Sequence, residues 1–263
     1  MGDVFSVKDR QNTFDDIVSV AKECDKIISL VQIGSGAVGY HDEKSDLDFV
    51  VALDSGDSMP EVMDFMHQRI SDKYDVLWFK QDESRHIQVY VLKNLLEIDI
   101  GYGGYLNAAA LKPNFKVIYD KSGTVEAKMT GSREFIDDRI FGDKLKKDIE
   151  SVRDTFWFHL MHAAVAVNRG NFLRAIGELE FVRNQYIDLL GDCYRLESRY
   201  NHDMDNLPEE VKDKIRSTYV VSENPQDMWK NIYNLTHLLY KELEDYEVPV
   251  SQELLLGYYN SFK

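Results

Sequence analysis

Two aspartates and a glycine-rich turn stand close together near the start of the chain. The turn, Gly34–Gly39, follows an apolar run at Ile27–Ile33. Asp46 and Asp48 then open a second apolar run that ends at Leu53. Residues two apart on a strand point to the same face, so both carboxylates would emerge together from such a strand. Paired carboxylates repel each other, and a divalent cation such as Mg²⁺ relieves that repulsion.

The glycine turn suits a phosphate group. Gly34 has no side chain to crowd phosphate oxygens, and Ser35 offers both a hydroxyl and a backbone N–H. A helical turn that starts near Ser35 would add its positive dipole end. The two segments together therefore predict a phosphate cradle beside a metal site. Either segment alone also fits an ordinary loop or a turn that enters a strand, and Ser35 could serve as a helix cap.

The order Gly-Ser, a short spacer and Ser-Asp-x-Asp, here Gly34-Ser35 and Ser45–Asp48, resembles the signature of the polymerase-beta-like nucleotidyltransferases. The resemblance implies that Gly34 and Ser35 hold a nucleoside triphosphate and that the two aspartates hold magnesium. The layout is similar to that of antibiotic nucleotidyltransferases acting on aminoglycosides or lincosamides, which join such a domain to a helical C-terminal half. Val38 departs from the family pattern, because many members carry Arg or another polar residue there.

The resemblance also implies a third carboxylate on a neighbouring strand. The run Leu95–Ile100 alternates, so that Glu97 and Asp99 share one face of a predicted strand. Asp99 fits the family pattern better and is predicted to be the catalytic residue, acting as a metal ligand, as the general base or as both, whereas Glu97 is expected to face water. Two Mg²⁺ ions would activate the attacking oxygen and stabilise the leaving pyrophosphate.

Composition limits the class of protein. The chain has 263 residues, of which 29% are charged and 44% hydrophobic, as in globular proteins. No apolar run approaches the ~20 residues that span a bilayer, and the N-terminus lacks the features of a secretory signal. Cys24 and Cys193 lie far apart and indicate no disulfide framework or zinc site. We therefore expect a cytoplasmic protein without a membrane partner.

The net charge of −15 bears on the partners of the protein. Such a surface repels a phosphate backbone, which argues against nucleic acid as the main partner. It would attract a cationic small molecule. Solubility alone explains the charge equally well.

The pattern of apolar residues predicts an α+β fold with two domains. The first is a nucleotidyltransferase domain at 1–135, with a mixed β-sheet flanked by helices, and the second is an α-helical bundle domain at 136–263. Strands are expected at 31–33, 47–53, 74–79, 87–92, 95–100 and 115–119, and helices at 14–30, 60–70, 106–111, 143–168, 171–200, 208–218, 226–243 and 251–259.

Four residues of the two long helices have side chains suited to chemistry. His159 and His162 lie one turn apart, but no carboxylate partner is evident, so aromatic packing is expected rather than a metal site. Glu178 and Glu180 stand on the next helix. In related antibiotic-modifying enzymes a helical-domain glutamate can serve as base, and the sequence leaves open whether either residue does so here.

These patterns predict a magnesium-dependent nucleotidyltransferase. It would move an NMP, in the first instance AMP from ATP, to a hydroxyl of a small molecule such as an aminoglycoside- or lincosamide-like antibiotic. The alternatives are transfer to a protein or tRNA, and a noncatalytic nucleotide-binding regulatory protein of a toxin–antitoxin type. Arg195 and His202 loosely match a ribonuclease pair of such modules, although chance explains their spacing better. The acceptor, the preferred triphosphate and the presence of a homo-oligomer stay open.

Overall fold

The computed structural model describes residues 4–111, 114–220 and 222–262. The chain is an α+β protein that divides into two compact units, Met1–Ile136 and Asp137–Lys263. The first unit is built on a mixed sheet with flanking helices, and the second is helical over the part that the structure describes. No helix among the described residues combines the length and apolar character needed to cross a bilayer.

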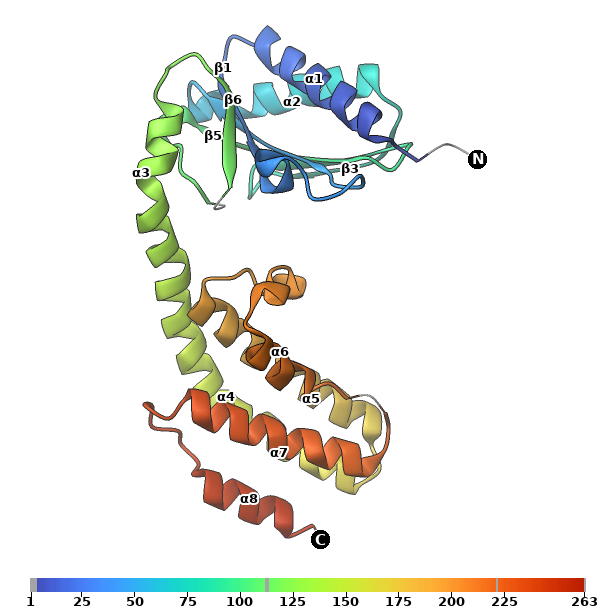
Figure 1. The fold of residues 1–263 in the computed structure, drawn as a ribbon, viewed down its shortest axis with the longest axis vertical. Helices are drawn as coiled ribbons and strands as arrows, with labels where there is room; N and C mark the ends of the chain where they lie inside the picture. Colours follow the sequence, from blue (N-terminus) through green and yellow to red (C-terminus); the bar gives the residue numbers. More distant parts are fainter. Residues whose placement is uncertain (1–3, 112–113, 221, 263) are drawn as a thin grey trace. The chain divides into compact units, whose positions relative to one another are not determined.

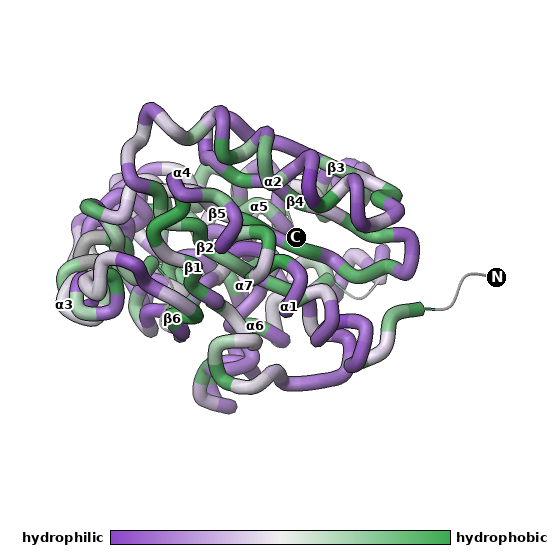
Figure 2. The backbone as a smooth tube through the Cα atoms, turned by 90° about the horizontal axis from the view of Figure 1, so that it is seen from above, coloured by the Kyte–Doolittle hydropathy of each residue, from purple (hydrophilic) through white to green (hydrophobic). Residues whose placement is uncertain are grey.

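The first unit contains one six-stranded sheet in the order β3-β4-β5-β2-β1-β6 (Figure 1). Its strands are β1 (Ile27–Ile33), β2 (Leu47–Leu53), β3 (Val76–Asp82), β4 (Ile87–Leu92), β5 (Glu97–Gly104) and β6 (Phe115–Asp120). β2 and β5 pair in parallel, and the other neighbouring strands pair antiparallel. Figure 2 shows largely hydrophobic stretches along β1 and β2, as expected of strands in the middle of a sheet.

Two helices, α1 (Val7–Glu23) and α2 (Met59–Lys73), cover one face of this sheet (Figure 1). α1 begins at a capping box in which Ser6 and Asp9 satisfy each other's backbone N–H groups. The main core of the unit lies between these helices and the sheet, where Phe49 and Ile98 are at most 1% exposed. The alternate residues of β2 and β5 therefore point to the opposite face.

On that opposite face, α3 (Val125–Asp137) and the segment before β6 pack against β1 and β6. A small core there contains Val31, Ala110, Val125 and Met129. On the same face, farther along the sheet, Trp78 of β3 keeps 49% of its surface exposed. The sequence did not predict α3, which runs through Gly131.

The first helix and its neighbouring strand differ from the sequence-based expectation. A helix was expected at 14–30, but α1 ends at Glu23 and the backbone is extended at Cys24. The residues from Ile27 onward form β1, which is buried between β2 and β6 and gains hydrogen bonds from both. This non-local pairing outweighs the helical spacing of the apolar residues. Likewise, the helix expected at 106–111 is only a 3₁₀ turn at Tyr105–Asn107.

The second unit is an array of helices around its own core. These helices are α4 (Asp143–Asn168), α5 (Phe172–Tyr194), α6 (Glu209–Arg216), α7 (Pro225–Glu242) and α8 (Gln252–Asn260). α4 and α5 form a long hairpin, and α7 and α8 pack against it. α5 ends earlier than the expected residue 200, because Arg195 adopts a left-handed conformation with φ 57°. Phe156, Leu160 and Tyr186 are fully buried in the core.

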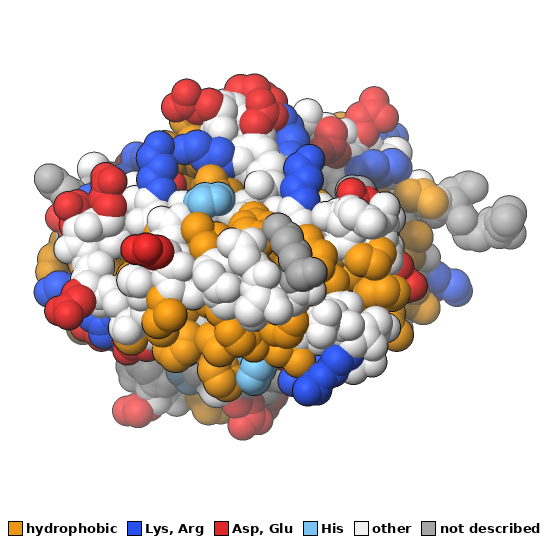
Figure 3. All heavy atoms as spheres, turned by 90° about the horizontal axis from the view of Figure 1, so that it is seen from below, with side chains coloured by type: hydrophobic (Ala, Val, Ile, Leu, Met, Phe, Trp, Pro, Cys, Tyr) orange, Lys and Arg blue, Asp and Glu red, His pale blue; other side chains and the backbone are white. Residues whose placement is uncertain are grey.

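The C-terminal helix carries apolar residues at the surface. Leu254 of α8 is 66% exposed, and Leu256 and Tyr258 are partly buried against the core. Hydrophobic side chains gather near the middle of the face drawn in Figure 3.

Candidate active site

The parallel pairing of β2 with β5 brings two of the predicted acids together. Asp48 lies opposite Asp99 in the register of these strands. Adjacent strands are about 4.8 Å apart, so the two side chains are neighbours on one face. Both are half-buried, and they point away from the face that α1 and α2 cover. Asp46 directly precedes β2 and Glu97 is the first residue of β5. Each lies two residues before the aspartate of its strand, so Asp46 and Glu97 form a second pair of acids on the same face.

The pKa values of Asp99 and Glu97 are both raised by burial and by neighbouring carboxylates. Burial raises the pKa of Asp99 to about 6, and the negative charges of Glu97 and Asp46 add to the rise. Burial also raises the pKa of Glu97, again with a contribution from Asp46. Glu97 is exposed, as the sequence predicted, but its charge acts on Asp99 and it belongs to the cluster. Sequence reasoning had assigned it no part there.

Two polar atoms beside this cluster lack a hydrogen-bond partner within the described protein. They are Oδ1 of Asp99 and Oγ of Ser35, and both are buried. A buried polar atom without a partner is costly, and its presence at a site of clustered charge is typical of a position that a ligand completes. Mg²⁺ prefers oxygen ligands, and these two atoms are oxygens.

Among the described residues, no three His, Cys, Asp or Glu side chains converge closely enough to form a complete metal centre. A magnesium ion seldom needs such a centre, because it takes one or two carboxylates and fills its other positions with water and substrate phosphates. Asp46, Asp48 and Asp99 fit that pattern in chemistry and in their shared face of the sheet.

Gly34 connects the turn to the aspartates through a steric requirement. Its backbone has φ +65°, and a Cβ built on it would lie 2.5 Å from Oδ2 of Asp48. A side chain at this position would therefore have to displace the Asp48 carboxylate, on a backbone conformation that favours glycine. The turn itself is a 3₁₀ helix at Gly34–Val38, closed by a left-handed Gly39. Its five residues make it much shorter than an α-helix, so any dipole contribution is small.

Arg10 of α1 holds the loop that leads from the turn to the aspartates. Its guanidinium donates to the carbonyls of Asp42 and Ser45, each at 3.0 Å, and lies 3.8 Å from the centre of the Tyr40 ring. The side chain is only 4% exposed. Tyr40 is fixed in turn by Gln32, whose amide donates to its hydroxyl at 2.8 Å. Sequence reasoning missed Arg10, since a single arginine on an amphipathic helix carries no distinguishing local signal.

The histidines of the second unit have a carboxylate partner after all. His159 Nδ1 lies 2.7 Å from Glu178 Oε2, and His162 Nδ1 lies 3.7 Å from Glu178 Oε1. The expectation that they lacked one was wrong, because the partner comes from α5 and not from their own helix. Glu180 instead pairs with Arg183 of its own helix. Glu178 is 17% exposed and Glu180 is 40% exposed, so neither is freely solvated.

The two residues of the hypothetical ribonuclease pair contact different acids. Arg195 Nη2 lies 2.6 Å from Asp138 Oδ1, and His202 Nδ1 lies 2.9 Å from Asp203 Oδ1.

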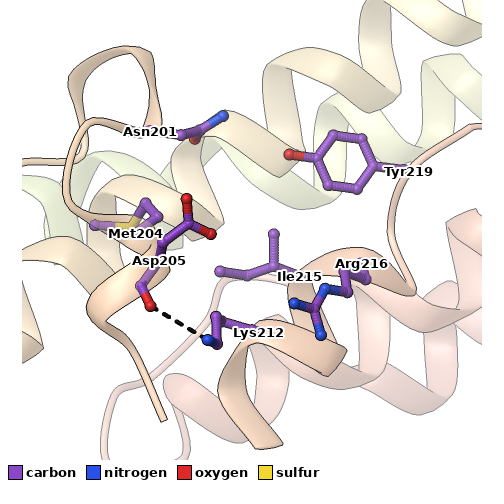
Figure 4. Close-up of a pocket in the computed structure, with 7 residues that line it drawn as sticks. All are labelled: Asn201, Met204, Asp205, Lys212, Ile215, Arg216 and Tyr219. Carbon is purple, nitrogen blue, oxygen red and sulfur yellow. Dashed lines mark hydrogen bonds between the residues drawn. The ribbon is translucent and has the colours of Figure 1, made fainter. Parts of the chain in front are cut away.

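Two pockets are lined by residues other than these carboxylates. One of about 520 Å³ in the first unit is lined by Met59, Met63, Gln81 and His86, on the face of the sheet that α2 covers. The other, of about 270 Å³, lies in the second unit beside Lys212 and Arg216 (Figure 4). The two cations of the second pocket already pair with acids of α6, so this pocket does not offer a free anion site.

No protein-family model matches the sequence, and no curated protein matches it. Among solved structures, the chain is similar to a nucleotidyltransferase-like protein from Exiguobacterium sibiricum 255-15. The identity is 10%, the TM-score is 0.39, and the alignment covers 97% of this chain and 87% of the other. It is also similar to a cytoplasmic RNA terminal U-transferase, with 14% identity, a TM-score of 0.30, and coverage of 88% and 64%. Neither likeness defines what this chain binds.

Proposed function

We propose that the chain is an enzyme, a magnesium-dependent nucleotidyltransferase, with a nucleotidyltransferase domain at 1–135 and a helical domain at 136–263. The observation that supports it most is the alignment of Asp48 with Asp99 on one face of the sheet, beside the Gly34-Ser35 turn. The residue types match the chemistry, because phosphoryl transfer needs a phosphate cradle next to clustered carboxylates.

In this proposal each residue has a separate role. Gly34 and Ser35 hold the terminal phosphates of ATP or another NTP, where the Ser35 hydroxyl, which has no partner in the described protein, donates to a phosphate oxygen. Asp46, Asp48 and Asp99 hold Mg²⁺, two ions in the full site, which when bound neutralises phosphate charge and polarises the phosphoryl group.

Asp99 also serves as the general base. Its half-buried carboxylate lies opposite Asp48 on the same face of the sheet, so it is placed to accept the proton of an attacking hydroxyl there. The acceptor oxygen forms a bond to the α-phosphorus, the bond from that phosphorus to the bridging oxygen breaks, and pyrophosphate leaves. The hydroxyl proton passes to a carboxylate oxygen of Asp99.

The acceptor in this proposal is a small molecule with a hydroxyl group, of the aminoglycoside or lincosamide type. The net charge of −15 favours a cationic acceptor over a polyanionic one such as tRNA. Such an activity would confer antibiotic resistance. Transfer to a protein side chain and a noncatalytic regulatory role are the outcomes that the experiment must separate from it.

The test is pyrophosphate release from ATP and GTP with Mg²⁺, across a panel of aminoglycosides and lincosamides. Asp48→Asn is the inactive variant, and Asp75→Asn, an exposed acid beside Lys93, is the matched control. Release that requires one acceptor, persists in the control and is lost in Asp48→Asn supports the proposal. Triphosphate binding without release from any acceptor contradicts the small-molecule acceptor, and the absence of triphosphate binding contradicts the whole proposal.

A further inference from the structure

The sheet face that carries the carboxylates continues onto β4 and β3 with apolar residues. In the strand register Glu97 lies opposite Val91, and Val91 lies opposite Trp78. Directly paired residues of antiparallel strands point to the same face. Phe79, the next residue of β3, packs on Tyr90 toward the helices, with ring centroids 4.9 Å apart. Trp78 therefore projects from the carboxylate face, where it is 49% exposed.

A second row runs beside the first. Asp99 lies opposite Val89, and Val89 lies opposite Lys80. Two strand spacings amount to about 10 Å, which is the distance from the carboxylates to the outer strand. The surface formed by Trp78, Val89 and Val91, bounded by Lys80, is here named the β3–β4 shelf. It is about as wide as one or two sugar rings.

The proposed reaction gives this shelf a position in the site. In an in-line displacement the attacking oxygen approaches the phosphorus from the side opposite the leaving group. The Gly34 turn follows β1, so the phosphates that leave as pyrophosphate lie on the β1 side of Asp48. The sheet order β4-β5-β2-β1 then puts the acceptor on the other side, over β5 and β4. The shelf lies next to this point.

We propose that the β3–β4 shelf binds the acceptor and that Trp78 is its stacking platform. This inference rests on the proposed function and names the acceptor's binding residues and chemical class. The occupant is a hydroxylated ring, a glycoside, whose apolar face lies on the indole and whose hydroxyl reaches Asp99. An indole offers a large rigid apolar surface for such a ring. Glu97, exposed at the inner end of the first row, suits an amino group carried by the acceptor.

The charge along the shelf refines this class. Carboxylates lie at its inner end, whereas Lys80 stands exposed at its outer end. A glycoside with a single amino group matches this arrangement better than a polycation that would extend past Lys80. We therefore expect a lincosamide such as lincomycin to bind more tightly than an aminoglycoside such as kanamycin.

A fluorescence titration tests the shelf without requiring turnover. Lincomycin and kanamycin are added separately to the full-length protein in the presence of Mg²⁺ and a nonhydrolysable ATP analogue. We expect a saturable change in tryptophan emission that is lost in Trp78→Phe, since Trp157 and Trp229 belong to the second unit. The absence of a saturable change with both probes, or an unchanged signal in Trp78→Phe, would overturn the proposal. Tighter binding of kanamycin would overturn the charge argument.

Kinetics separate the shelf from the proposed function itself. In an active enzyme, Trp78→Ala should raise the KM for the acceptor by about tenfold or more, the usual size of a lost stacking contact, and leave the KM for ATP unchanged. Trp78→Phe should recover most of the loss. Gln81→Ala, on the opposite face of the same strand, is the matched control and should change neither KM. An unchanged acceptor KM in Trp78→Ala would contradict acceptor binding at the β3–β4 shelf, but it would not contradict the proposed nucleotidyltransferase activity.

Discussion

At the scale of single residues, the acidic cluster around Asp99 destabilises the folded protein. Half-buried carboxylates stand together, and burial and repulsion raise the pKa of Asp99 to about 6. Such an arrangement is typical of sites where function outweighs stability. The cluster is therefore a place where removing a charge should help the fold and harm the activity.

Asp99→Asn should stabilise the metal-free protein at neutral pH. A carboxyl whose pKa is raised in the folded state binds its proton more tightly there, so wild-type stability falls as pH rises from the unfolded value of 3.8 through about 6. The variant lacks this loss, and its free energy of unfolding should exceed that of wild type by about 1–3 kcal/mol near pH 8. Most of the difference should disappear by about pH 4, where the Asp99 carboxyl of folded wild type is uncharged, as the amide of the variant always is.

The measurement is urea unfolding with EDTA at both pH values, with Asp75→Asn as the exposed control. The same Asp99→Asn protein should have lost nucleotidyl transfer. A variant that is less stable than wild type near about pH 8 would contradict the assigned environment of Asp99.

At the scale of elements, the site depends on two connections that hold the turn and the loop after it. The turn at Gly34–Val38 rests against Asp48 of β2, and Arg10 of α1 ties down the segment that leads to Asp46. Each connection can be tested by a single substitution.

Gly34→Ala should damage both the fold and triphosphate binding. A methyl group there would approach Oδ2 of Asp48 to 2.5 Å, on a backbone with φ +65° that L residues rarely adopt. We expect a loss of about 1–3 kcal/mol in stability, together with weaker binding of ATP by equilibrium dialysis. Gly56→Ala, where the added methyl has open space, should change neither quantity. Wild-type ATP affinity in Gly34→Ala would refute the role of the turn.

Arg10→Met should loosen the loop from Tyr40 to Ser45. The variant keeps the length of the side chain but loses the donors to two carbonyls and the stacking on Tyr40. Hydrogen bonds from a charged donor contribute about 1.5–3 kcal/mol, so the protein should lose roughly that amount of stability. Arg10→Lys should recover only part of it, because an ammonium lacks the planar fork. Faster amide hydrogen exchange confined to residues 40–46 is the expected signature, and protection equal to wild type would count against it.

At the scale of the whole molecule, the chain has separate hydrophobic cores in its two units. The cores built on α1, α2, α3 and the sheet lie within the first unit, and the core of Phe156, Leu160 and Tyr186 lies within the second. Units with their own cores are expected to unfold as separate cooperative blocks.

Leu160→Ala should therefore destabilise the second unit alone. The side chain is fully buried, and its truncation leaves a cavity that costs about 2–5 kcal/mol. Calorimetry should show one transition moving to lower temperature while the other stays in place, and Mg²⁺ with ATP should raise only the unmoved transition. A single transition that shifts as a whole would show that the units unfold together.

Much of this fold could be predicted from local pattern. Alternation along β2, β4 and β5 and the helical spacing of α4, α5 and α7 are properties of neighbouring residues, and those elements lie near their expected positions. The exceptions are instructive. β1 is a strand because two partners pair with it, although its apolar spacing continues that of α1. The carboxylate partner of His159 lies on another helix, and contacts between helices leave no trace in the spacing within one helix.

The sequence by itself determined the α+β class, the glycine turn and the alternation that puts Asp46 with Asp48 and Glu97 with Asp99. Those features follow from backbone periodicity and from the conformational freedom of glycine, which act over a few residues. Only the tertiary structure decided three other features. These are the parallel register that places Asp48 opposite Asp99, the hydrogen bonds from Arg10 to the loop before β2, and the face of the sheet from which Trp78 projects. These depend on strand pairing and packing between distant segments, whose free energy is gained only when the whole sheet and its helices assemble.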